Sequence, residues 1–305
     1  MSFNITILGS SGALPAYGRF PSSQFIEIQN RYFLVDCGEG TQIQLRRYDL
    51  NLHRINHIFI SHLHGDHYLG LMGLLFTMHL QQRMSDLHLY SHPGLDEIIT
   101  LQLKHSHSAL NYNLIFHPLK KNVHEIIFED DKVQVETLPL QHKITCSGFL
   151  FREKEKPRRI DKTLLPDGLL LQQLAALKRG EDVMNDEGLI LYRNQDLTMP
   201  GRRCRSYAYC SDTAYFTALI PLVKEVDLLY HEATFAEEDS IKAKETKHST
   251  AKEAAALAQQ ARVKKLALGH FSARYKDLSI LENEAKEIFP NIALAVEGLT
   301  FSLEE

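Results

Sequence analysis

The sequence lacks any apolar run long enough to cross a bilayer. Its most apolar segment, residues 69–80, is interrupted by polar side chains and is shorter than the ~20 residues that a membrane-spanning helix needs. The opening residues, 1–5, also lack the basic stretch followed by an apolar run that marks a secretory signal. We therefore expect a soluble protein that is not secreted and has no membrane partner.

Cysteine is scarce as well. The four cysteines are Cys37, Cys146, Cys204 and Cys210, and they lie far apart in the chain. They show neither the CxxC spacing of a metal or redox site nor the pattern of a disulfide framework. We predict that they are small buried apolar residues rather than metal ligands, and that the protein is cytoplasmic.

The chain also lacks an excess of positive charge, with a formal net charge of -4. Phosphate neutralisation by Lys and Arg dominates affinity for RNA, so this balance argues against RNA binding by the surface as a whole. Residues 152–162, however, hold Arg152, Lys154, Lys156, Arg158, Arg159 and Lys162 against three acidic residues, and Arg202, Arg203 and Arg205 follow. This cluster is either an RNA-binding surface or a solvated loop, and both interpretations stay open.

No linker, internal repeat or low-complexity tract divides the 305 residues, so we expect a single domain, 1–305. Strands are expected at 3–8, 24–29, 31–36, 57–61, 87–91, 123–128, 133–138, 145–151, 206–210, 226–230, 264–269 and 292–301. Helices are expected at 69–82, 94–104, 213–224, 250–262 and 280–288. Strands that dominate early and later alternate with helices favour an α/β fold with helices outside the sheets. The stretch from about 152 to 205 fits this layout poorly and is interpreted as an insertion.

The most informative motif follows the expected strand at 57–61. His62, His64, Asp66 and His67 place three imidazoles and one carboxylate within six positions. Zn²⁺ prefers imidazole nitrogen and carboxylate oxygen, and a catalytic zinc takes about three protein ligands plus an open position. Four donors in so short a loop suit two adjacent ions, provided that further ligands come from elsewhere in the chain.

Three candidates for those further ligands follow later strands. His142, Asp212 and His270 each come at the end of an expected strand, where loops are free to converge on one cleft. The other histidines have no neighbouring donors and are expected to be surface or interface residues: His53, His57, His79, His88, His92, His105, His107, His117 and His124.

Beyond these residues, the whole chain resembles the ribonuclease Z family of the metallo-β-lactamase superfamily, in its short form. The histidine-rich motif alone indicates the superfamily but does not distinguish the family within it. The segments that narrow the resemblance are 8–12, 19–23, 33–42, 211–213, 231–234, 248–250 and 269–275.

The resemblance implies an αββα sandwich of two mixed sheets and two zinc ions per subunit. His62 and His64 with His142 would hold one ion, Asp66 and His67 with His270 would hold the other, and Asp212 would bridge them. Asp66 is the carboxylate expected to accept and donate protons. Glu232 would orient His248, which would donate a hydrogen bond or a proton at the phosphate or the leaving oxygen. Asp36, by contrast, is expected to be a hydrogen-bonded turn residue beneath the site.

The family's inserted arm grips tRNA away from the metals, and residues 152–205 stand at its place. Lys178 and Gly180 match the end of the arm's motif, whereas Pro166-Asp167-Gly168 departs from its usual Gly-Pro start. Arg19 belongs to a loop expected near the RNA 3′ end, although Phe20 replaces the more usual Asn there. We expect substrate contacts from Arg19, Lys178, Gly180 and Arg274.

The function implied is a zinc endoribonuclease that removes the 3′ trailer of precursor tRNA and leaves a 3′-hydroxyl, acting as a homodimer. An alternative is a two-zinc phosphodiesterase or exoribonuclease that acts on small diesters or other RNA ends, because one metal centre serves many esters. A third is a degenerate scaffold that binds RNA without cutting it. Such relatives lose metal ligands, whereas all seven candidates are present here.

Overall fold

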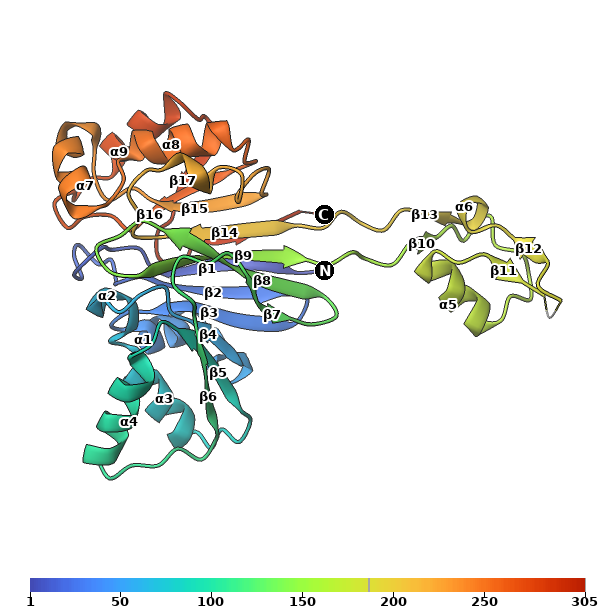
Figure 1. Ribbon diagram of the computed structural model, residues 1–305, viewed down its shortest axis with the longest axis horizontal. Helices are drawn as coiled ribbons and strands as arrows, with labels where there is room; N and C mark the ends of the chain where they lie inside the picture. Colours follow the sequence, from blue (N-terminus) through green and yellow to red (C-terminus); the bar gives the residue numbers. More distant parts are fainter. Residues whose placement is uncertain (186, 305) are drawn as a thin grey trace.

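Two seven-stranded sheets packed face to face form the body of the protein. They are seen in a computed structural model that describes residues 1–185 and 187–304. Helices cover the outer face of each sheet, and a long segment projects from one end of the sandwich (Figure 1). The α/β class and the layered arrangement predicted from the sequence are confirmed.

The first sheet has the strand order β18-β1-β2-β3-β4-β5-β6. Its strands are β1 (Phe3–Gly9), β2 (Ser23–Ile28), β3 (Arg31–Cys37), β4 (His57–Phe59), β5 (Leu87–Ser91), β6 (Leu114–Pro118) and β18 (Thr300–Ser302). Strands β1, β2 and β3 pair antiparallel, whereas β3 through β6 pair parallel. The β2–β3 hairpin turns at Gln29 and Asn30, which both have a left-handed φ, a conformation that Asn tolerates better than most residues.

The second sheet repeats this plan in the order β17-β16-β15-β14-β9-β8-β7. Its strands are β7 (Ile126–Glu129), β8 (Val133–Leu140), β9 (Cys146–Glu153), β14 (Ser206–Cys210), β15 (Leu228–Glu232), β16 (Leu266–Gly269) and β17 (Ile292–Leu294). The strands β7, β8, β9 and β14 pair antiparallel, and β14 through β17 pair parallel. Both sheets are therefore mixed.

Alternation along the central strands explains why the sheets are covered on both faces. In β14, Tyr207 and Tyr209 belong to the core between the two sheets, whereas Ala208 and Cys210 pack toward the helices. All four side chains are fully buried. A strand buried on both faces reads as a nearly continuous apolar run, as this one does.

The helices form the two outer layers. Beside the first sheet lie α1 (Thr41–Arg47), α2 (Gly65–Tyr68), α3 (Leu71–Leu80) and α4 (Leu95–His105), and beside the second lie α7 (Ser240–Thr246), α8 (Ala251–Gln260) and α9 (Ser279–Lys286) (Figure 1). Helix α8 begins at a capping box, in which Thr250 Oγ1 accepts from Glu253 N and the Glu253 carboxylate accepts from Thr250 N. Among the described residues, no helix is both long and apolar enough to span a membrane.

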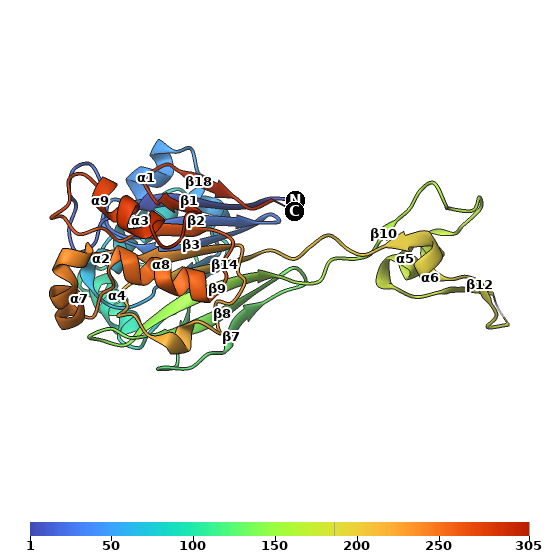
Figure 2. The same cartoon turned by 90° about the horizontal axis from the view of Figure 1, so that it is seen from above.

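The projecting segment, residues 154–205, joins the end of β9 to the start of β14 (Figures 1 and 2). It holds β10 (Arg159–Ile160), α5 (Leu171–Arg179), β11 (Val183–Met184), β12 (Ile190–Tyr192), α6 (Asn194–Leu197) and β13 (Thr198–Met199). Its small core is formed by Leu177, Val183 and Leu197. At its root, the buried Arg205 Nη2 lies 2.6 Å from Glu153 Oε1.

Several expected elements differ from the structure. The helix expected at 213–224 is only a single 3-10 turn, Thr217–Leu219, because Pro221 lacks the N–H that a longer helix needs. The strand expected at 292–301 is two short strands, β17 and β18, which belong to different sheets. Strand β6 and the helices α1 and α7 were not expected, and no strong periodicity marks them.

Candidate metal centre

The seven candidate ligands meet at one edge of the sandwich, where several strands end. His62 and His64 follow β4, His142 follows β8, Asp212 follows β14 and His270 follows β16. Loops beyond the carboxyl ends of strands are the usual place for sites in α/β proteins. Residues far apart in the sequence come together here for that reason.

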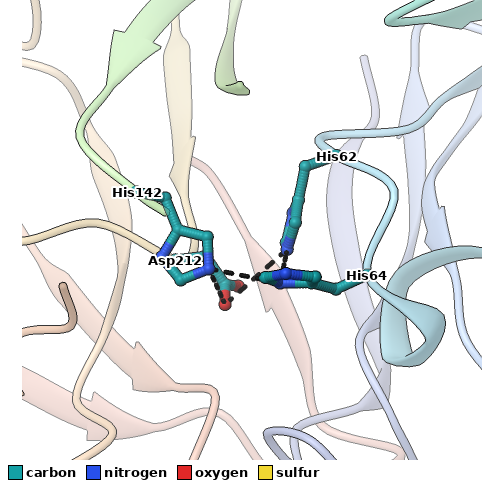
Figure 3. A group of neighbouring side chains, drawn as sticks. All are labelled: His62, His64, His142 and Asp212. Carbon is teal, nitrogen blue, oxygen red and sulfur yellow. Dashed lines mark hydrogen bonds and ion pairs between the residues drawn. The ribbon is translucent and has the colours of Figure 1, made fainter. Parts of the chain in front are cut away.

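The first group consists of His62, His64, His142 and Asp212, whose donor atoms lie within 4.8 Å of one another (Figure 3). His64 Nδ1 lies 3.0 Å from His62 Nε2 and 3.2 Å from His142 Nε2. Asp212 Oδ1 lies 3.9 Å from His62 Nε2 and 3.8 Å from His142 Nε2. Burial lowers the pKa of His62, His64 and His142, so each imidazole is kept neutral, the form that binds a metal.

The second group consists of Asp66, His67 and His270. The other oxygen of Asp212, Oδ2, lies 3.0 Å from His67 Nε2 and 3.2 Å from His270 Nε2. Asp66 Oδ2 lies 3.4 Å and 3.5 Å from the same two nitrogens. The two carboxylate oxygens of Asp212 thus face different groups, which is the arrangement of a bridging ligand.

These donor sets fit two zinc ions. Tetrahedral ligands about 2.0–2.1 Å from a zinc ion are roughly 3.3 Å from one another, close to the spacing within each group. Furthermore, His67 Nε2 and His270 Nε2 are buried without a hydrogen-bond partner among the described residues. A buried polar atom without a partner is costly, and a cation between these nitrogens and the carboxylates would satisfy both.

Asp36 lies beneath the centre and is hydrogen-bonded, as expected, but it belongs to strand β3 and not to a turn. Its Oδ2 lies 2.7 Å from His67 Nδ1 and accepts from Ser61 Oγ and Tyr209 Oη, while its Oδ1 accepts from Ser61 N. A carboxylate on the second ring nitrogen fixes the tautomer of a histidine ligand. Asp36 has a left-handed φ of 55°, and these bonds hold it there. Tyr209 was not identified as part of the site from the sequence, because nothing marks a strand tyrosine as a partner of a distant aspartate.

Glu232 and His248 form a second layer on the other side of the centre. The Glu232 carboxylate is 2.9 Å from His248 Nδ1 and accepts from Thr213 N, Ser249 N and Thr234 Oγ1. Although burial alone would lower the pKa of His248, the Glu232 carboxylate raises it to about 9. His248 is thus positioned by a fully buried, fully hydrogen-bonded carboxylate.

Thr234 and Lys247 connect these residues to the ligands. Thr234 Oγ1 lies 2.9 Å from His270 Nδ1, and the Lys247 carbonyl oxygen lies 3.1 Å from His142 Nδ1. Thr234 belongs to a motif that the sequence analysis used, but its contact with His270 was not predicted. A backbone carbonyl leaves no signal in a sequence.

Asp66 is fixed from outside its own loop. Its Oδ2 accepts a hydrogen bond of 2.7 Å from Ala13 N, in the loop after β1. Burial opposes ionisation, but His67 and His270 hold the pKa of Asp66 far below its usual range. The carboxylate is therefore charged and aimed at the two histidines.

The four residues expected to contact substrate do not come together. Arg19 is only 7% exposed, and its Nη2 donates to the Tyr275 carbonyl oxygen at 2.7 Å. Arg274 is exposed, 4.0 Å from Asp239. Lys178 and Gly180 lie at the end of α5 in the projecting segment. The position of Arg19 indicates that it holds the 272–275 loop against the 12–20 loop.

Two minor expectations were wrong. Cys204 is exposed, although the other three cysteines are buried as predicted. His92 is buried and lies 3.1 Å from Ser147 Oγ, so it is not a surface residue. His57 stacks on His88 within the first sheet, and both side chains are half-buried.

Comparisons with family models cover most of the chain in two parts. Residues 3–157 match the model described as anti-Pycsar protein Apyc1. Residues 197–271 match the model described as beta-lactamase superfamily domain.

Full-length relatives are similar over the entire chain. The ribonuclease Z of Cytophaga hutchinsonii is 47% identical over 305 residues, which is 100% of this chain and 97% of that protein. The ribonuclease Z of Bacteroides thetaiotaomicron is 44% identical over 99% of this chain and 95% of its own length. Among solved structures, human tRNase Z, short form, is similar with a TM-score of 0.72 and 27% identity, covering 99% of this chain and 100% of that one. The yeast long-form RNase Z matches with a TM-score of 0.69 and 18% identity, over 100% of this chain and 42% of that chain, a likeness of fold.

Proposed function

This chain belongs to the ribonuclease Z family of the metallo-β-lactamase superfamily and is a nuclease, and from that premise we propose that it removes the 3′ trailer from precursor tRNA. The cut is endonucleolytic and zinc-dependent, and it leaves a 3′-hydroxyl on the tRNA. One observation carries the proposal: seven potential metal donors from four segments of a chain 41–47% identical to ribonucleases Z lie close together. The alternative, a two-zinc phosphodiesterase or exoribonuclease for other ends or small diesters, has no use for the projecting segment.

Two zinc ions per subunit are part of the proposal. His62, His64 and His142 would hold one, Asp66, His67 and His270 the other, with Asp212 between them. When bound, such ions lower the pKa of a water molecule and stabilise charge on the scissile phosphate. The unpartnered Nε2 atoms of His67 and His270 support this assignment.

The chain's own residues would supply positioning and proton transfer. Asp66, which Ala13 N holds in place, would accept a proton from the attacking water. His248, whose Nδ1 is bound to Glu232, keeps its other ring nitrogen as a donor toward the phosphate or the leaving oxygen. Glu232 would act through His248 only, since its hydrogen bonds are all made within the protein.

The projecting segment supports a role in gripping the tRNA body, through Lys178 and Gly180 among others. We treat the chain as a single metallo-β-lactamase-like domain, 1–305, with this arm inserted at about 152–205. The arm begins where β9 ends, and the eight residues of β9 at about 3.3 Å each put its root roughly 25 Å from the candidate centre. It points away from that centre (Figure 1), which favours a homodimer in which one subunit's arm holds tRNA bound at the partner's site.

Substrate contacts by Arg19 and Arg274 remain predictions of this proposal. Arg274 is exposed in the loop after His270, at 4.0 Å from Asp239, and would turn toward a phosphate of the substrate. Arg19 would act by shaping the loop near the RNA 3′ end. A cytoplasmic location, where precursor tRNA is found, completes the proposal.

Cleavage of a labelled precursor tRNA tests the proposed function. Replacing Asp66 with Ala should lower kcat by about 10³-fold, because the carboxylate serves both as ligand and as proton acceptor. The control is Asp131→Ala, which removes a surface carboxylate that is 72% exposed and should change kcat less than about 2-fold. Product ends are mapped, and bound zinc is measured by mass spectrometry. Unchanged cutting by Asp66→Ala, or cutting that survives complete chelation, would contradict the proposal.

A further inference from the structure

Two hollows adjoin the candidate metal centre and share part of their lining. The first has a volume of about 520 Å³ and includes His142, one of the candidate ligands, in its wall. The second has a volume of about 410 Å³. Both are lined by Lys121, Ile144 and Thr145, so they form one groove that leads away from the centre. We call it the lysine groove.

The charge of the lysine groove is of one sign. Lys121, Lys143 and Lys247 line it, and no Asp or Glu is among the described residues of its lining. Lys121 and Lys143 are exposed, and neither forms an ion pair among the described residues. On a protein with a net charge of -4, three lysines without acidic neighbours make a local site for an anion.

The groove starts at the candidate centre itself. Lys247 Nζ donates to the His142 carbonyl oxygen at 3.3 Å, while the Lys247 carbonyl oxygen lies 3.1 Å from His142 Nδ1. Lys247 has a left-handed φ of 58°, and it directly precedes His248. The groove therefore begins beside His142 and next to the residue that precedes His248.

The rest of the lining is largely apolar. Ile144 is 39% exposed between the lysines, Phe216 lines the first hollow, and Leu63, Pro93 and Leu119 line the second. Lysines along a groove combined with apolar and aromatic surfaces are the features that bind single-stranded nucleic acid, with phosphates on the cations and bases on the apolar surface. Each hollow has the size of a site for one small ligand, such as a single nucleotide.

We propose that the lysine groove binds the first nucleotides of the 3′ trailer as a single strand, with Lys121 and Lys143 on its phosphates. The inference rests on the proposed function, which supplies an RNA that continues beyond the cut. The tRNA side of the cut offers one unpaired nucleotide before the acceptor stem, and a duplex does not splay its bases into separate hollows. Two hollows in succession therefore suit the trailer.

Trailer length tests this assignment. Precursor tRNAs with trailers of one and of eight nucleotides are cleaved by the wild-type full-length protein and by the double variant Lys121→Glu/Lys143→Glu. The double variant should raise KM for the long trailer about 10-fold, as for loss of one or two phosphate contacts. KM for the one-nucleotide trailer should rise less than about 3-fold.

Two further variants separate the groove from general effects of charge and folding. Lys132→Glu reverses the charge of one surface lysine directly before β8, at the end of that strand far from His142, and should leave KM unchanged for both trailers. Ile144→Glu places a carboxylate on the exposed apolar surface and should reproduce the length-dependent loss. Equal KM changes for both trailers in the double variant, or no change in either, would overturn the proposal.

Failure of the proposed function would be seen separately. If the wild-type protein cut no precursor tRNA, binding of a fluorescent single-stranded RNA octamer would still test the groove by anisotropy. Binding weakened about 10-fold by Lys121→Glu/Lys143→Glu but not by Lys132→Glu would support a single-strand site, and equal binding by all three proteins would reject it.

Discussion

The sandwich and the projecting segment are joined at the ends of β9 and β14, yet they differ in how they are held together. In the sandwich, β9 and β14 place Phe149, Phe151 and Tyr207 in a core where these side chains are fully buried. The projecting segment, joined to the same two strands, buries chiefly Leu177, Val183 and Leu197, and its exposed apolar side chains include Leu170, Leu171, Leu189, Ile190 and Leu191. A region with so small a core opens at lower free energy than the body to which it is attached.

This difference matches the two tasks that the proposed function requires. A metal centre needs its ligands held to within about 0.5 Å, and here the candidate ligands follow strands of the two sheets. Holding a large, curved RNA instead requires a segment that extends far from the body. A segment with a small core can do so without a rigid structure of its own. Four experiments test this difference between the two regions.

The largest effect is expected from removing the projecting segment. Replacing residues 157–202 with a short glycine-serine linker keeps Glu153 and Arg205, the buried pair at its root. The kcat/KM for precursor tRNA should fall about 10³-fold, that is ~4 kcal/mol, whereas hydrolysis of a small chromogenic diester should change less than about 2-fold. Equal losses on both substrates would show that the segment supports the sandwich rather than the RNA.

The root itself belongs to the sandwich, and Glu153→Gln tests this. The Glu153 carboxylate accepts from Arg205 Nε, Arg205 Nη2, Gln29 Nε2 and Arg205 N. Burial alone would raise the pKa of Glu153, but Arg205 and the other donors lower it to about 2. Removing the charge takes a shared carboxylate from the buried Arg205 and Lys156 and should lower the free energy of unfolding by about 3 kcal/mol in urea titrations.

The control for that variant is Glu129→Gln, which neutralises a carboxylate paired with Lys154 on the surface. Surface pairs contribute little, so a change below about 0.5 kcal/mol is expected. Similar losses in the two variants would contradict the view that the root is a buried ion pair of the body.

A matched pair of leucine substitutions compares the two cores. Leu257→Ala empties a fully buried position against the second sheet and should lower the free energy of global unfolding by about 3 kcal/mol. Leu177→Ala, equally buried, should leave the global transition within about 0.5 kcal/mol and instead speed trypsin cleavage within 158–193. A global loss from Leu177→Ala as large as that from Leu257→Ala would show that segment and sandwich unfold as one unit.

The smallest effect is expected on the pH dependence of stability. The two regions should differ in it because residues 154–205 contain no histidine. Burial, followed by the charges of His88 and His117, lowers the pKa of His57 to about 4. The unfolded chain, with a pKa near 6.5, therefore binds a proton before the folded chain does. Stability from this site is complete above about pH 6.5 and declines as the pH falls toward 4.

His57→Leu should remove roughly 1 kcal/mol of the loss in unfolding free energy between pH 7 and pH 4.5, after allowance for solvent screening. His105→Leu, an exposed control at the end of α4, should leave that difference unchanged. Trypsin cleavage of the projecting segment should show no such dependence on acid. An identical pH response in wild type and His57→Leu would rule out His57 as a source of it.

The ligand motifs could be predicted from sequence because their chemistry is local. His62, His64, Asp66 and His67 lie in one loop, and a strand before each of His142, Asp212 and His270 indicated where they would converge. Most strands of the two sheets were also predicted, since runs rich in Ile, Val and Phe mark buried strands.

What could not be predicted depends on contacts between distant segments. Ala13 N is hydrogen-bonded to Asp66, Tyr209 to Asp36, and the Lys247 carbonyl oxygen to His142. The type of a residue does not predict such a contact. The short elements α1, α7 and β6 are similarly held by packing rather than by a periodic pattern. The helix expected at 213–224 shows the opposite error, in which a favourable composition was overridden by one proline.

Both termini lie at the root of the projecting segment, where Arg205 Nη1 donates to the carbonyl oxygens of Met1 and Leu303 (Figures 1 and 2). A purification handle or fluorophore fused at either end would therefore stand beside the arm and far from the histidine cluster. Such fusions would leave small-molecule hydrolysis intact while hindering capture of a large RNA, so an assay on a tagged protein would underestimate only the activity on RNA.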